Sequence, residues 1–96
     1  MSTHLTPLQV CELLIGPLPV LSQLAGLNEK AAYLWRRKSA WREAGDMPPR
    51  VNRRLLAHAA ANRIPLTPGH LIWGAPREEI EALVAERDVG QQVAAE

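Results

Sequence analysis

The sequence predicts an all-α protein, a bundle of five or six helices in one domain. Three observations support this prediction. Apolar residues recur at intervals of three and four in several segments, which is the period of a helix. Proline, glycine, threonine and asparagine separate these segments and act as helix start and stop signals. No segment of useful length alternates between apolar and polar residues, as a half-buried strand would.

The first helix is predicted from its caps. Thr6 and Gln9 have the spacing of a capping box, and Pro7 suits the first helical position. Gly16 and Pro17 end the segment. Its apolar positions recur at helical spacing: Leu8, Cys11, Leu14 and Ile15. Cys11, the single cysteine, is expected to be a small core residue rather than a nucleophile.

A second helix begins near Pro17–Pro19 and ends at Gly26, because glycine tolerates the left-handed conformation of a tight turn. Asn28 then caps a third helix that we expect from Glu29 to about Ala44. One side of this helix carries small side chains and one large one, Trp35, and is expected to pack on the second helix: Ala31, Ala32, Trp35 and Ser39. The other side is basic and aromatic: Lys30, Tyr33, Leu34, Arg37 and Trp41.

The end of this third helix stays open at the level of sequence. A break near Lys38–Ser39 would turn Trp41 inward, so Trp41 remains divided between the core, a dimer contact and a contact at a groove edge. Trp35 is expected in the core.

The second half of the chain predicts a turn and three further helical segments. Glycine and two prolines mark a turn over residues 44–49, and a fourth helix follows from about Pro49 to Asn62. Thr67–Ile72 forms a short capped helical turn, after which Trp73 is expected to fill the core under the last helix. That helix spans residues 75–88, at the end of a domain covering 1–88, and residues 89–96 are expected to fray.

The net charge of +1 conceals a strong asymmetry along the chain. Residues 28–54 hold eight basic and three acidic residues, whereas residues 76–96 hold two basic and six acidic ones. A positive pole beside a negative segment favours an oriented approach to a polyanion. The alternative is that these charges merely solvate the helix surfaces.

Five residues in 18–37 have a spacing shared with known DNA-binding proteins. A small residue lies at the expected helix crossing, glycine and leucine mark the turn, and two residues occupy the buried side of the next helix: Ser22, Gly26, Leu27, Ala32 and Trp35. This segment resembles the helix-turn-helix of phage Cro and phage-repressor type regulators. Gly45–Arg50 is similar to the step into their fourth helix, and a weaker resemblance covers residues 5–74. The sequence departs from the family pattern in three respects. Serine stands at position 22 where alanine is usual, and alanine stands at position 32 where valine or isoleucine is usual. The stretch from Trp35 to Pro48 is also longer than in most members of the family.

The resemblance implies where DNA would be bound. The base-reading positions fall on the start and exposed side of the third helix: Asn28, Glu29, Lys30, Tyr33, Leu34 and Arg37. Six other cations are candidates for phosphate contacts: Arg36, Lys38, Arg42, Arg50, Arg53 and Arg54. If about five of these neutralise phosphates, the log–log slope of affinity against salt is expected at roughly −4 to −5. Arg36 can alternatively pair with Glu43.

We therefore expect a sequence-specific regulator of transcription that binds double-stranded DNA, with repression by promoter occlusion as its mode. A homodimer is expected, because one reading helix buries little surface and two can meet half-sites about 34 Å apart. The candidate interface is the apolar set near the end of the chain: Leu71, Ile72, Trp73, Ile80, Leu83 and Val84. Alternatively these residues only complete the core of the monomer.

Other classes are disfavoured or remain as rivals. Three scattered histidines and one cysteine offer no metal-ligand spacing, so no metal, cofactor, small-molecule effector or enzymatic activity is expected. No apolar run approaches the ~18 residues of a membrane span, no secretion signal is evident, and one cysteine suits a reducing cytoplasm. The rivals are a helical adaptor or antirepressor that binds protein, a DNA-binding antitoxin, and a recombination accessory factor.

Overall fold

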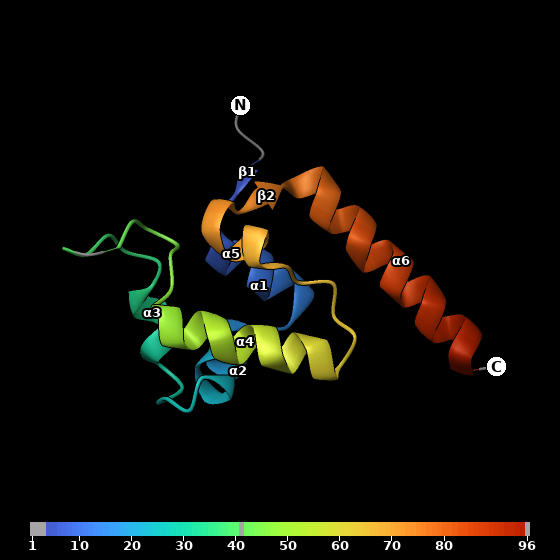
Figure 1. Cartoon of the computed structure of the whole chain (residues 1–96), viewed down its shortest axis with the longest axis horizontal. Coiled ribbons are helices and arrows are strands. Elements are labelled where there is room, and N and C mark those ends of the chain that lie inside the picture. Colours follow the sequence, from blue (N-terminus) through green and yellow to red (C-terminus); the bar gives the residue numbers. More distant parts are fainter. Residues whose placement is uncertain (1–3, 41, 96) are drawn as a thin grey trace.

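The protein is mostly helical in the computed structural model, which describes residues 4–40 and 42–95, the stretch 88–95 by its backbone alone. This agrees with the all-α prediction at the level of class. The described residues form six helices and one two-stranded sheet (Figure 1): β1 His4–Leu5, α1 Pro7–Leu14, α2 Leu18–Leu24, α3 Ala31–Leu34, α4 Pro49–Ala61, α5 Pro68–Trp73, β2 Ala75–Pro76 and α6 Arg77–Ala95.

The helix caps follow the sequence closely. Thr6 Oγ1 accepts a hydrogen bond from the Gln9 backbone N–H at 3.3 Å, and Gln9 Oε1 accepts from the Thr6 N–H at 2.9 Å, which completes the predicted capping box of α1. A second capping box opens α5, where Thr67 Oγ1 accepts from the His70 N–H and His70 Nδ1 accepts from the Thr67 N–H. These local signals therefore fix three helix starts, including α4 after Pro48.

The small antiparallel sheet is a structure that the sequence did not predict. Leu5 pairs with Ala75 and His4 with Pro76, so the start of the described chain lies against the segment that leads into α6. His4 Nε2 donates a hydrogen bond to the Trp73 carbonyl at 2.7 Å. Two-residue strands are too short to show an alternating pattern, which is why sequence periodicity misses them.

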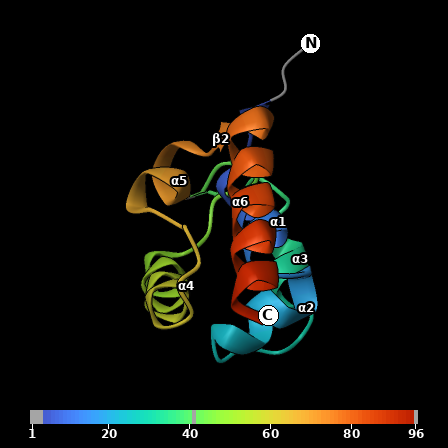
Figure 2. The same cartoon turned by 90° about the vertical axis from the view of Figure 1, so that its right-hand side faces the viewer.

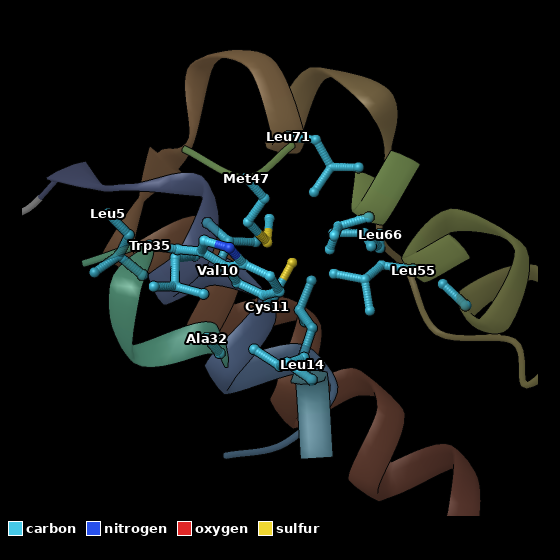
Figure 3. Close-up of a cluster of buried hydrophobic side chains, with 14 of the residues drawn as sticks. Leu5, Val10, Cys11, Leu14, Ala32, Trp35, Met47, Leu55, Leu66 and Leu71 are labelled. Atoms are coloured by element: carbon cyan, nitrogen blue, oxygen red, sulfur yellow. The ribbon is translucent and has the colours of Figure 1, made fainter. Parts of the chain in front are cut away.

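The core is centred on α1, which packs against α5, α6 and α2. Val10, Cys11 and Leu14 of α1 lie in the middle of the buried cluster, with Leu55 of α4 and Leu71 of α5 around them (Figure 3). The core positions predicted for Cys11 and Leu14 are confirmed. Burial raises the pKa of the Cys11 thiol to about 12, with a smaller contribution from the nearby Glu12 carboxylate.

The last helix differs from the prediction at both of its ends. It begins at Arg77, because residues 75–76 belong to β2, and its backbone remains helical as far as Ala95. Ile80 is fully buried, and Arg87 Nη1 donates to the Leu14 carbonyl at 2.9 Å, which ties α6 to the end of α1. Figures 1 and 2 show α6 as a straight helix that leads from the sheet to the far end of the molecule.

Within the described part of the chain, no helix taken singly combines the length and apolar composition of a span, and α1 with α2 reach these limits only as a pair with a 94° bend between them.

Candidate nucleic-acid interface

The turn between α2 and α3 has the geometry that the sequence predicted. Gly26 has a φ of +76°, in the left-handed region that favours glycine. The Gly26 N–H donates to the Gln23 carbonyl and the Leu27 N–H donates to the Ser22 carbonyl, both at 2.9 Å. These two bonds close the end of α2 and reverse the chain, so that α3 packs back against α2.

The crossing of α2 and α3 is fastened by the side chain of Ser22. Its hydroxyl donates to the Leu18 carbonyl at 3.1 Å and accepts from the Ala32 backbone N–H at 2.8 Å. Ser22 and Ala32 are both fully buried, so the hydroxyl satisfies a donor that water does not reach. A serine in place of alanine therefore adds a hydrogen bond at the crossing without adding bulk.

Replacing Ser22 with alanine is expected to lower the free energy of unfolding by about 1–3 kcal/mol, because the buried Ala32 N–H then has no partner. Denaturant unfolding followed by circular dichroism measures this change. Ser39, whose side chain is exposed, provides the matched control, and Ser39→Ala is expected to stay within about 0.5 kcal/mol. Equal effects of the two substitutions would contradict the role assigned to Ser22.

The third helix is much shorter than predicted, and the expectation of a helix from Glu29 to about Ala44 is wrong. It covers Ala31–Leu34, and the Trp35 N–H bonds to the Ala32 carbonyl in a tighter turn. The chain then folds back, because the Gly45 N–H donates to the Trp35 carbonyl at 2.8 Å. Burial of Trp35 and this return contact outweigh the helical propensity of the following residues. Trp41 lies outside the described residues.

The prediction that Asn28 caps the third helix is wrong, because the N-cap residue of α3 is Lys30 and it makes no side-chain capping bond. Asn28 Oδ1 accepts from the Lys30 N–H at 2.9 Å, and the Asn28 carbonyl accepts from the Ala31 N–H. Asn28 thus stabilises a turn that presents Glu29 and Lys30, both exposed, immediately before α3.

The predicted base-reading residues lie close together and accessible, although they do not share one helix. Asn28, Glu29 and Lys30 precede α3, and Arg37 follows it in the exposed loop. Tyr33 and Leu34 lie on α3 with 40% and 65% of their surfaces exposed. The Arg36 guanidinium carbon lies 5.1 Å from the centre of the Tyr33 ring, a cation–π arrangement that occupies Arg36 at this site.

The phosphate candidates fall into two groups on different parts of the chain. Arg36, Lys38 and Arg42 belong to the loop after α3, while Arg50, Arg53 and Arg54 are exposed on α4. A Cβ atom placed on Gly26 would lie 2.5 Å from Arg54 Nη1, so this cation reaches the turn itself.

Arg42 departs from the expected role. It is half-buried, and its Nη1 donates to the Asp46 carbonyl at 3.3 Å, so it stabilises its own loop.

A surface hollow that the sequence did not indicate lies between α2 and the start of α3. It has a volume of about 450 Å³, and its lining is mainly apolar although it includes two charged residues. Its walls are formed by Pro19, Glu29, Lys30 and Tyr33. Pro19 was read only as a helix-start residue, and its place in this wall depends on the crossing of two helices, which a linear pattern does not show.

The predicted dimer residues separate into three groups. Leu71 and Ile80 are buried in the core of the single chain and are withdrawn as interface residues. Leu83 and Val84 are half-buried against that core. Ile72 and Trp73 are 64% and 76% exposed, so the expectation that Trp73 fills the core is wrong. It fails because α5 ends at Trp73 and the chain turns at Gly74 into β2.

The basic loop after α3 and the acidic helix α6 lie toward different ends of the molecule. α3 and the loop that follows it lie at one end of the long axis, and α6 lies toward the other (Figure 1). The acidic residues of the described part of α6 are therefore remote from the cations near α3: Glu78, Glu79, Glu81 and Glu86. Among residues 4–40 and 42–87, no three His, Cys, Asp or Glu side chains gather as metal ligands.

No known protein family, curated protein or solved structure matches this chain. The arrangement of its own residues is therefore the basis for inferring its function.

Proposed function

We propose that the protein binds duplex DNA in a sequence-specific manner through a Cro-like helix-turn-helix formed by α2, the Gly26 turn and α3. The observation that supports this most strongly is the buried Ser22–Ala32 hydrogen bond beside a left-handed glycine turn, with exposed polar residues immediately in front of α3. Such a unit holds a short reading element rigidly on a small core, which is what groove recognition requires.

Glu29 and Lys30 supply complementary chemistry for reading bases. The Lys30 ammonium donates to guanine O6 and N7, and the Glu29 carboxylate accepts from cytosine N4. Both residues are exposed at the mouth of the hollow. Because α3 ends at Leu34, Arg37 reaches the groove from a loop, which gives its guanidinium more freedom of approach than a helical position would.

The remaining cations position the protein on the DNA backbone. Arg50, Arg53 and Arg54 on α4 and Lys38 in the loop are exposed and contribute affinity that does not depend on sequence. Arg36 and Arg42 are each engaged by a neighbour in the free protein and contribute less.

Two copies of the chain are proposed to act together. A single four-residue reading helix covers few bases, whereas a two-fold pair presents two such helices to half-sites about 34 Å apart. Of the residues predicted for the dimer interface, Ile72 and Trp73 are exposed and available for pairing. Leu83 and Val84, which are half-buried, are proposed to lie at the edge of that interface. The proposed function is a cytoplasmic regulator associated with the nucleoid that represses transcription by occluding a promoter.

Selection of bound duplexes from a random pool tests this function. The wild-type chain is expected to enrich one motif, and Lys30→Ala and Arg37→Ala are expected to alter or abolish it. Arg53→Ala is the matched control, since it removes a cation from α4 and is expected to weaken all duplexes to a similar extent.

An unchanged motif in both variants would refute the assignment of the base readers. Absence of binding to any duplex at low salt would instead favour a protein-binding adaptor that uses the exposed Tyr33 and Leu34.

A further inference from the structure

The hollow beside α3 is unusual because it is mainly apolar and yet lies among charged residues. Pro19, Tyr33, Glu29 and Lys30 all line it, and Glu29 and Lys30 carry their charged groups at the ends of long side chains. Long charged side chains commonly cover apolar surface with their methylene stems and keep the charged group in water. The hollow therefore offers an apolar interior with an anion and a cation at its edge.

The edges of the DNA bases present few groups that suit such an interior. In the major groove, the hydrogen-bonding atoms of all four bases are polar, and the 5-methyl group of thymine is the apolar feature. The hollow is open to the surface and its volume of about 450 Å³ is large enough for the methyl-bearing edge of a pyrimidine.

We propose that this hollow receives the 5-methyl group of a thymine, which makes Pro19 and Tyr33 determinants of sequence specificity. This inference rests on the proposed function, since it assigns the hollow to the surface that faces the groove. Lys30 and Glu29 at its edge read a neighbouring G·C pair, so the preferred half-site contains a thymine next to a guanine–cytosine pair.

Tyr33 is suited to this role because its ring is restrained. The Arg36 guanidinium stacks over the ring, which limits the positions that the tyrosine side chain can take. Leu34, the next residue on α3, is more exposed and does not line the hollow. A methyl contact through Tyr33 can therefore be distinguished from one through Leu34.

Replacing thymine with deoxyuridine removes only the methyl group and so isolates this contact. In the selected operator, deoxyuridine at the thymine beside the G·C pair is expected to weaken binding about fourfold per half-site, which corresponds to about 0.8 kcal/mol. Substitutions at the other thymines are expected to have little effect. Titrations of wild type, Tyr33→Ala and Leu34→Ala with both duplexes form double-mutant cycles.

The cycles give distinct outcomes. In Tyr33→Ala the two duplexes are expected to bind equally, whereas Leu34→Ala is expected to keep the fourfold difference. Thermal unfolding of both variants establishes that they fold, and Pro19→Gly provides a second way to open the hollow. Sequence-specific binding that is unaffected by deoxyuridine at every thymine, or a difference lost in Leu34→Ala and kept in Tyr33→Ala, would overturn the inference and leave the proposed function intact. Failure to bind any duplex would overturn both.

Discussion

Replacing Gly74 with alanine is expected to lower the free energy of unfolding by at least about 3 kcal/mol, a large part of the total for a domain of this size. Gly74 has a φ of +72° and a ψ of −155°, a region open essentially to glycine alone. A Cβ atom there would also collide with the Leu5 carbonyl oxygen of β1. Leu5 is held by its pairing with Ala75, and the Gly74 N–H is held by a hydrogen bond to the His70 carbonyl, so neither side of the contact can move away without breaking these interactions.

Thermal unfolding measures this effect, and the midpoint is expected to fall by more than about 12 °C. Gly69→Ala is the matched control, since Gly69 lies inside α5, the helix that ends just before Gly74. A Cβ on Gly69 would meet only Thr67 Oγ1, at 3.6 Å, and alanine favours the helix, so this variant is expected to be as stable as wild type or slightly more so. Similar behaviour of the two variants would show that the β1–Gly74 contact does not constrain the fold.

Replacing Trp35 with alanine is expected to cost about 3–5 kcal/mol of stability. Trp35 is 4% exposed, ends α3 and accepts a hydrogen bond from the Gly45 N–H through its carbonyl. Loss of the indole leaves a cavity between α3 and the core and loosens the loop that contains Arg36, Arg37 and Lys38. The variant is therefore also expected to lose affinity for DNA beyond what its unfolded fraction explains.

Trp73→Ala provides the comparison, since the same side chain is removed from a position that is 76% exposed. At low protein concentration, the free energy of unfolding of Trp73→Ala is expected to remain within about 0.5 kcal/mol of the wild-type value. Denaturant unfolding of the two variants measures the contrast, and DNA titration at a temperature where both are folded measures the effect on the loop. A Trp73→Ala protein as unstable as Trp35→Ala would contradict the burial of these residues.

The sequence was sufficient for features that depend on local chemistry. The capping boxes at Thr6 and Thr67 and the glycine turn at Gly26 each involve residues within a few positions of one another, and all three are present. The helical period likewise identified Leu8, Cys11 and Leu14 among the buried positions of α1, although it missed Val10.

The features that sequence reasoning missed depend on contacts between distant residues. The end of α3 is decided by a bond from Gly45 to Trp35, and nothing within residues 35–44 marks it. Trp73 is exposed because β2 pairs with β1, some 70 positions earlier in the chain, and draws α6 away from it. Periodicity reports that a residue is apolar, but only the packing of the other elements decides whether it is covered.

The candidate site was predicted in its residues more than in its shape. Glu29, Lys30 and Tyr33 were named through the resemblance to helix-turn-helix regulators, and all three line the hollow. Pro19 and the hollow that it helps to form arise from the α2–α3 crossing. Whether these residues bind DNA remains a prediction that the selection experiment tests.

The pairing of His4–Leu5 with Ala75–Pro76 has a consequence for biosynthesis. During translation, α1 leaves the ribosome before the residues of α5 and α6 that pack against it. A growing chain therefore leaves the buried side of α1 partly uncovered until Ile80, which is fully buried in the completed fold, has been added.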